Sequence, residues 1–351
     1  AGREGGGLIG AGRLGIGGAA GGGQARRQVA APGHRGQVAG AAGGAVPKVA
    51  GGHASVTVDW DPDLIADHAG VTGGDKPAHP VPDVLVGLAW PSVFAVLGDV
   101  QTAGGTPVIE GMLDLVHLDH AIALDGTLPT ARAQLSIGAV VESVDDTDYG
   151  RVVTVDVTIS AGRQGIATLR ERFAIRGRTG GGELADPARA GGSLGDDVHD
   201  TPRKSRGTAS VAAPTDLRAF AAVTGDHNPI HTSLAAARLA GLGDPIVHGM
   251  WVSAAAQQVV SDRRITGWTT RFMAPVRPGA TVDIRADRVG LDAGAEVVDI
   301  SCRVEGEVVM AATARLEAPR TAYAFPGQGI QHPGMGMAAY ARSKAAREIW
   351  D

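Results

Sequence analysis

The sequence predicts an α+β fold built from two copies of one unit, each a helix followed by an antiparallel sheet. Apolar stretches over 84–98 and 249–262 each have the character of a core helix. Four segments follow each stretch in which apolar and polar residues tend to alternate with a period of two, as in half-buried strands. The order of elements is therefore expected to repeat, although the sequence itself does not.

The first unit is expected over 53–178. It begins with a short alternating strand, Val56–Trp60, and its helix contains Pro91, where we expect it to be interrupted or capped. The strands that follow are expected at 107–124, 132–144, 151–160 and 165–176.

The second unit is expected over 208–319. Thr215 is expected to cap a helix that ends at Gly225, and a loop and a short helix from Ser233 come before helix 249–262. The strands that close the unit are expected at 267–274, 280–290, 295–304 and 307–316.

Three further segments do not fit the repeat. Residues 1–52 hold 19 glycines and no sustained periodicity, which predicts a linker or a disordered tail. Residues 179–207 are rich in Gly, Asp, Pro and Arg and are expected to form a second linker. Residues 320–351 begin with a strand and turn at 322–331, and a helical pattern opens at Gly334.

Composition and charge limit the kinds of partner and site that we expect. The net charge of −5, the pI of about 6.1 and the aromatic content of 4% favour neither nucleic acid nor an anionic membrane as a partner. The longest apolar stretch, 84–98, is too short to span a bilayer. The one cysteine, Cys302, excludes an internal disulfide and a cysteine metal cluster, and we expect a cytoplasmic protein.

The segment Gly225-Asp-His-Asn-Pro-Ile-His231 carries the clearest chemical signal. Pro229 stiffens the loop, so Asp226 and His231 could point into one space. A carboxylate beside an imidazole suits proton transfer. An Asx-turn with a surface histidine explains the segment equally well. A metal site formed by Asp226, His231 and His248 is a third interpretation, but no zinc-binding motif supports it and we expect no metal.

A second element is His248-Gly249-Met250, at the predicted start of a helix. Backbone N–H groups there are unpaired and the helix dipole is positive. Gly249 has no side chain to block a ligand, so its N–H group could stabilise the oxygen of a thioester that gains negative charge. A glycine at this position can equally serve packing or capping alone.

Together the two elements, Asp226–His231 and Ala240-Gly-Leu-Gly-Asp-Pro-Ile-Val-His-Gly-Met250, resemble the (R)-specific enoyl-thioester hydratases and MaoC-like dehydratases. The turn Phe272–Gly279 fits the same family, and the resemblance covers about 208–318. It implies a hot-dog fold, in which an antiparallel sheet wraps a long helix, and hence a double hot-dog for the whole.

Residues 80–177 resemble the degenerate first half of double hot-dog members, through Trp90-Pro-Ser-Val-Phe94 and Leu115-Val-His-Leu-Asp-His120. This half lacks its own copy of the Asp-x-Asn-Pro-x-His motif. The resemblance implies that it shapes an acyl-chain tunnel, which His117 could line; a core or surface position for His117 is the alternative.

The family resemblance implies loss of water from a (3R)-3-hydroxyacyl thioester to give the trans-2-enoyl thioester, or the reverse, without a cofactor. Asp226 and His231 would share the proton transfers, with His231 accepting the α-proton, and Gly249 would stabilise the enolate oxygen. Asn228 would hold the loop or the leaving water. His248 and Ser253 are supporting candidates, although helix packing is an alternative for Ser253.

The segment Phe325-Pro-Gly-Gln-Gly-Ile-Gln331 resembles the opening of a malonyl/acyl transferase domain, without the nucleophile elbow such domains need. A dehydratase followed by a transferase resembles type I fatty acid synthases of microbes. We interpret the chain as a piece of such an oligomeric synthase, acting on thioesters of acyl carrier protein beside other synthase domains. A free-standing hydratase of CoA thioesters, a non-catalytic scaffold and an acyltransferase are the alternatives.

Overall fold

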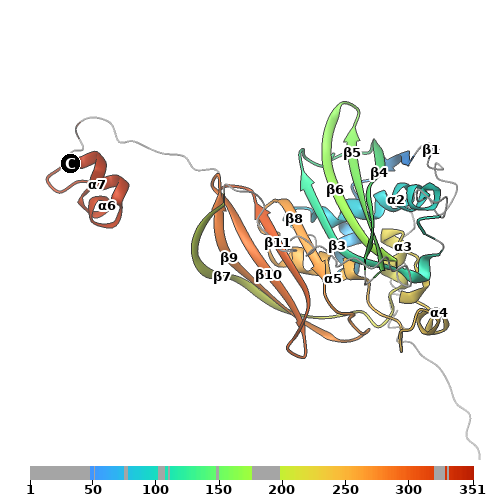
Figure 1. Ribbon diagram of the computed structural model, residues 1–351. Helices are drawn as coiled ribbons and strands as arrows, with labels where there is room; N and C mark the ends of the chain where they lie inside the picture. Colours follow the sequence, from blue (N-terminus) through green and yellow to red (C-terminus); the bar gives the residue numbers. More distant parts are fainter. Residues whose placement is uncertain are drawn as a thin grey trace, which may run out of the picture. The chain divides into compact units, whose positions relative to one another are not determined.

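A computed structural model describes residues 48–50, 52–74, 78–101, 107–109, 111–147, 150–175, 198–319, 329 and 332–351 (Figure 1). Its strands join into one antiparallel sheet of eleven in the order β1-β2-β4-β5-β6-β3-β8-β11-β10-β9-β7. The strands are β1 (Lys48–Ala50), β2 (His53–Trp60), β3 (Leu115–Leu124), β4 (Ala133–Thr147), β5 (Gly150–Ala161), β6 (Gln164–Ile175), β7 (Val198–Ala212), β8 (Ile265–Phe272), β9 (Thr281–Asp292), β10 (Ala295–Val304) and β11 (Glu307–Leu316).

The strand order repeats about the centre of the sheet. Outward from the centre, the first half (residues 48–175) runs β3-β6-β5-β4-β2, with the short β1 beyond β2, and the second half (residues 198–319) runs β8-β11-β10-β9-β7. In each half the strand before the helices lies at the outside and the strand after them lies at the centre. The two halves therefore have the same topology, and the predicted repeat of architecture is present.

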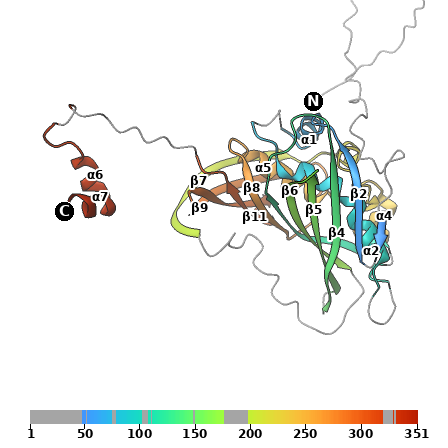
Figure 2. The ribbon, with the colours of Figure 1, turned by 90° about the horizontal axis from the view of Figure 1, so that it is seen from above.

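The helices repeat as well. In the first half they are α1 (Leu64–Val71), the 3₁₀ helix η1 (Pro82–Leu85) and α2 (Val86–Asp99). In the second half α3 (Arg218–Thr224), η3 (Pro229–His231) and α4 (Leu234–Leu239) come before α5 (Gly249–Val259). Helix α2 packs against β2 and β4, and α5 packs against strands of the second half, including β7 and β9 (Figures 1 and 2).

Alternating hydrophobicity builds the core. Along β2, Ala54, Val56, Val58 and Trp60 are buried and the residues between them are exposed. The Trp60 indole N–H donates to the Pro129 carbonyl at 2.8 Å, which satisfies its polar group. One continuous cluster of buried side chains includes residues from both halves.

The halves meet at the pairing of β3 with β8, where Ile122 lies opposite Trp268 and His120 lies opposite Thr270. Helix contacts add to this seam. The Trp251 indole N–H of α5 donates to the Val71 carbonyl of α1 at 2.9 Å. Gly87 of α2 lies so close to Thr224 of α3 that a Cβ there would be 2.4 Å from the Thr224 carbonyl oxygen. Only glycine fits this approach of the two helices.

Three sequence predictions need correction. Strand β7 begins at Val198, inside the linker expected over 179–207. Its early residues are charged, including Arg203, Lys204 and Arg206, because β7 is the outermost strand of its half, so no apolar period marks it. Thr215 does not cap α3, which begins at Arg218 after Leu217 without a side-chain cap. Helix α1 was not predicted.

The helix with Pro91 also differs from the prediction. Helix α2 continues through Pro91 without a break, and nine of its residues are buried, so packing of the helix outweighs the lost backbone hydrogen bond. The stretch Pro82–Asp99 is long and apolar enough to cross a membrane, but 72% of it is buried inside the protein. It is therefore a core helix, as predicted.

The C-terminal segment contains α6 (Met337–Arg342) and α7 (Lys344–Trp350). The Ser343 hydroxyl accepts a hydrogen bond from the Ala346 N–H at 3.2 Å and so caps α7. The predicted helical pattern is thus two short helices. Residues 1–47 and most of the strand and turn expected over 322–331 lie outside the described residues.

Candidate active site

A cavity of about 260 Å³ opens between the two halves. The second half contributes Asp226, Asn228, His231 and Gly249, and the first half contributes His117. The remaining walls are mostly apolar and include Trp90, Phe94, Phe173, Phe272, Met273, Pro275, Val276 and Met310. An apolar cavity with a few convergent polar groups is the usual form of a small-molecule site.

The loop after α3 turns sharply into this cavity. Gly225 ends the helix with a φ of 73°, a left-handed conformation that favours glycine. One oxygen of the Asp226 carboxylate accepts from the Asn228 N–H at 3.1 Å, and the Asn228 side-chain oxygen accepts from the Ile230 N–H at 3.3 Å. The Asx-turn and the convergence of side chains, weighed as alternatives from the sequence, are thus both present.

His231 presents one nitrogen for proton transfer. Its Nδ1–H donates to the Ile246 carbonyl at 2.8 Å, because a carbonyl oxygen can only accept. This bond fixes the proton on Nδ1 and leaves Nε2 with its lone pair. Burial lowers the pKa of His231, and the Asp226 carboxylate opposes that effect. His231 is therefore neutral at pH 7 and able to act as a base.

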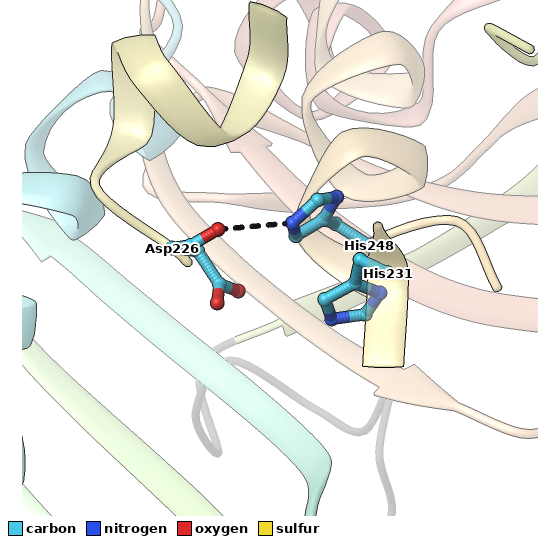
Figure 3. A group of neighbouring side chains, drawn as sticks. All are labelled: Asp226, His231 and His248. Carbon is cyan, nitrogen blue, oxygen red and sulfur yellow. Dashed lines mark hydrogen bonds between the residues drawn. The ribbon is translucent and has the colours of Figure 1, made fainter. Parts of the chain in front are cut away.

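His248 lies behind His231 and supports it. The two rings stack with centroids 3.7 Å apart and planes tilted by 26° (Figure 3). The His248 Nε2–H donates to the backbone carbonyl of Asp226 at 3.2 Å, which ties the start of α5 to the loop. Burial, then the neighbouring His231, lower the pKa of His248 to about 4. His248 is fully buried and does not line the cavity, so it positions other groups.

Gly249 begins α5, as predicted, and lines the cavity. Among the described residues its backbone N–H has no hydrogen-bond acceptor. A Cβ at this position would be 2.9 Å from the Phe272 ring, so Gly249 also permits close packing. Close packing therefore requires glycine here, and the role of its N–H as an oxyanion donor stays a prediction.

His117 lines the cavity, as predicted, but its surroundings were not foreseen. Its Nε2–H donates to Glu171 at 2.8 Å, and the other Glu171 oxygen accepts from His120 Nδ1–H at 2.7 Å. His120 Nε2 lies 3.2 Å from an oxygen of Asp83, and that same oxygen accepts from the Gln257 side chain at 2.6 Å. These five residues form a buried polar network that joins the first half to α5.

Ser253 does not belong to the site. It is fully buried, its hydroxyl accepts from the Trp268 indole N–H at 2.9 Å, and it does not line the cavity. Its role is packing of α5 against β8, the alternative named from the sequence.

Asp226, His231 and His248 place one ligand atom each within 4.8 Å of one another, a spacing compatible with a metal ion. The orientation of the rings does not suit one. Imidazole binds metals at about 2 Å along a lone pair in its ring plane, whereas these two rings lie nearly parallel and overlap. The arrangement suits proton transfer better, because a water can bridge the carboxylate and an imidazole at such separations.

Comparison with known proteins places this geometry in a family. The sequence model of the MaoC like domain matches residues 196–310. Residues 196–310 form a MaoC-like dehydratase domain. The match covers β7 through the start of β11 and includes every second-half residue of the site.

Two curated relatives illustrate the sequence similarity. The fatty acid synthase beta subunit stcK of Emericella nidulans is 38% identical over 151 residues, which is 40% of this chain and 8% of that protein. The fatty acid synthase subunit beta of Saccharomyces cerevisiae is 35% identical over 146 residues, 39% of this chain and 7% of that protein. The chain spans less than a tenth of either relative. Both matches are to beta subunits of fungal fatty acid synthases.

Solved structures resemble both halves. HtdX of Mycobacterium tuberculosis aligns with a TM-score of 0.58 at 22% identity, covering 75% of this chain and 100% of that one. A MaoC-like dehydratase from Phytophthora capsici aligns with a TM-score of 0.59 at 18% identity, covering 76% and 95%. At these identities the likeness concerns the fold, and the predicted double hot-dog is confirmed. The family match ends at residue 310, so the transferase resemblance of 325–331 stays a prediction.

Proposed function

We propose that the MaoC-like domain removes water from (3R)-3-hydroxyacyl thioesters to give trans-2-enoyl thioesters, and catalyses the reverse hydration. One observation carries the proposal. His231, neutral and with its Nε2 lone pair available, lies beside the Asp226 carboxylate in an apolar cavity that also contains the N–H of Gly249. A base, a second proton-transfer group and an oxyanion donor are the groups that this elimination needs.

In the dehydration direction His231 Nε2 takes the proton from C2. The electron pair of that C–H bond forms the C2–C3 double bond, and the C3–O bond breaks. The departing hydroxyl takes a proton and leaves as water. Asp226 relays to the hydroxyl the proton that His231 has taken from C2, directly or through a water, since its carboxylate and the imidazole lie within 4.8 Å. The opposite division of labour between Asp226 and His231 is the competing mechanism.

The thioester carbonyl would accept a hydrogen bond from the Gly249 N–H. Negative charge grows on this oxygen as the α-proton leaves, and the start of α5 places a positive dipole end beside it. The thioester and this donor together acidify C2, so the reaction needs no cofactor. His248 keeps the base in place by stacking on His231 and bonding to the Asp226 carbonyl.

We infer that the natural substrates are thioesters of acyl carrier protein and that other synthase domains act beside this one. The support is the similarity to fungal synthase beta subunits. A cytoplasmic location and an oligomeric synthase follow from the same inference. A free-standing hydratase of CoA thioesters would use the same residues, so the preference for carrier protein over CoA distinguishes the two. Residues 320–351 as the start of a transferase complete the proposed organisation.

The test is hydration of crotonyl thioesters, followed by the loss of enoyl absorbance, in the full chain and in Asp226→Asn and His231→Ala. Removing a general acid or base is expected to reduce kcat by roughly 10²–10⁴-fold. Ser253→Ala is the matched control on α5, because Ser253 lies outside the cavity. Full activity in both site variants would overturn the assignment, and an inactive parent would favour the non-catalytic scaffold.

A further inference from the structure

The buried network around Glu171 has only one member that reaches the cavity. Glu171, His120, Asp83 and Gln257 are all buried, whereas the His117 side chain is 17% exposed and lines the cavity wall. Buried ion pairs seldom add stability over apolar packing, because desolvation offsets their attraction. A role for this network is therefore best sought in what it does to His117.

The fold brings the two histidines to one carboxylate through a β-bulge. Along β3, His117 lies opposite Phe173 of β6 and Asp119 lies opposite Arg172, so Leu118 is an extra residue in the ladder. In a regular strand residues 117 and 120 would face opposite sides of the sheet. The bulge turns His117 and His120 to the same side, where each reaches one oxygen of Glu171.

The hydrogen bond to Glu171 decides which nitrogen His117 presents. The neighbouring imidazolium of His120 and the hydrogen bonds from both histidines lower the pKa of Glu171 to about 2 against the effect of burial. An ionised carboxylate only accepts, so Nε2 of His117 carries the proton. Nδ1 has no hydrogen-bond partner in the parts of the chain that the structure describes.

The ring cannot easily turn away from the cavity. His117 stacks on Phe173 with centroids 4.8 Å apart, meets the edge of Trp90 at 5.7 Å and lies 5.1 Å from Phe272. The Phe272 ring in turn contacts Gly249. One aromatic ring, Phe272, therefore separates His117 from Gly249, the proposed donor to the thioester oxygen.

We propose that His117 is a specificity-determining residue that disfavours long saturated acyl chains. This inference rests on the proposed function for its substrate class, an acyl thioester. A short acyl group leaves water on Nδ1, whereas a long saturated chain displaces that water and offers the nitrogen no partner.

The expected discrimination against long acyl chains follows from the free-energy cost of burying an unsatisfied polar atom. That cost corresponds to roughly 5–150-fold in a binding constant. Replacing His117 with an apolar side chain of similar size removes this penalty, which applies to long chains and not to short ones. The three aromatic rings around this position suit an acyl chain better than the amide-rich arm of a carrier.

The experiment compares the full chain with His117→Leu and His117→Asn. Calorimetric titration with butyryl-CoA and decanoyl-CoA gives the ratio of their Kd values, and neither saturated thioester can be dehydrated. We expect His117→Leu to shift this ratio about ten-fold or more toward decanoyl-CoA. His117→Asn, which is smaller but polar, should stay close to the parent. The kcat/KM values for crotonyl-CoA and trans-2-decenoyl-CoA should change in parallel.

An unchanged ratio in His117→Leu would overturn the proposal, as would an equal shift in His117→Asn, which would show that space and not polarity decides. Absence of binding of both CoA probes would also overturn it. The ratio is insensitive to partial misfolding, because both ligands report on the same folded fraction. A binding shift without any turnover would leave this inference standing and refute the proposed function, whereas turnover with an unchanged ratio would do the reverse.

Discussion

The two halves of the molecule share one topology and use buried histidines in opposite ways. In the first half, burial opposes protonation of His120, but Glu171 and Asp83 outweigh it and raise the pKa to about 10. In the second half, burial dominates and lowers the pKa of His231, and that of His248 to about 4. The first half thus keeps a structural cation, and the second keeps two neutral rings, one of which can accept a proton.

The connection between the first and second helices accounts for much of this difference. In the first half only residues 72–81 separate α1 from η1. In the second half residues 225–248 separate α3 from α5, and they hold Asp226, Asn228, His231, α4 and His248. One fold therefore supports two roles, because the longer loop brings a carboxylate and an imidazole to the start of α5, whereas the shorter one leaves no room for them.

The largest expected contrast is in stability. Glu171→Gln should lower the free energy of unfolding by about 3–5 kcal/mol, because it leaves the buried His120 imidazolium without its main counter-charge. Asp226→Asn, partly exposed in the cavity, should change it by less than about 1 kcal/mol. Urea unfolding of both variants measures the difference, and equal effects would show that the two halves do not differ in this way.

The halves should also respond differently to high pH. His68 of the first half and His248 of the second have folded pKa values of about 4, below the usual 6.5, so in both halves this contribution is complete above pH 6.5 and is lost as the pH falls toward 4. His120 has a folded pKa of about 10, so its contribution is complete below pH 6.5 and is lost as the pH rises toward 10. Each loss is on the order of 3 kcal/mol.

Hydrogen exchange at pH 5, 7 and 9 checks this second prediction. Protection around α1 and α5 should weaken first in acid, and protection around β3 and β6 should weaken first in alkali. His248→Phe should flatten the acid-side loss around α5 and leave the alkaline side unchanged. Identical pH profiles for the two halves would contradict the assigned charge states.

The pH dependence of the hydration rate should reflect the same charge states, with a smaller expected effect. Because His231 acts as a neutral base and its pKa is lowered by burial, hydration should persist at pH 7 and decline only below about 6.5. The Asp226 carboxylate raises the pKa of His231, so Asp226→Asn should move the acid limb of its residual activity to lower pH. A shift to higher pH, seen in kcat/KM across pH 4–8, would refute this coupling.

Much of this comparison could be predicted from the sequence, and the exceptions have physical reasons. The period of two located β4 and β10 because buried residues alternate along them with less buried ones. Pro229 disfavours a helical conformation of the residue before it, and Asn228 has a ψ of 119°. Strand β7 was missed because an outermost strand need not alternate, although the repeat itself called for a strand matching β2.

The residues around the cavity likewise divide into those that the sequence predicted and those that it did not. Asp226, His231 and Gly249 come from one local segment and the helix start just after it, so motif spacing was enough to group them. Glu171 and Asp83 lie 54 and 34 residues from His117 along the chain, and only the bulge at Leu118 and the sheet register bring them together. Bulges leave no clear mark on alternation, so the network around His117 could not be read from the sequence.

The smallest predicted effect tests whether Ser253 of α5 belongs to the active site. Ser253→Ala removes the acceptor of the buried Trp268 indole N–H and should lower the free energy of unfolding by roughly 1–3 kcal/mol. Trp268→Phe in the same background removes the donor as well, so the double variant should lose less than the sum of the two single losses. Both should keep the hydration rate of the parent, because Ser253 and Trp268 lie outside the cavity. Reduced kcat in Ser253→Ala at unchanged folded fraction would place Ser253 in the active site, and α5 would then contribute more to catalysis than its first turn.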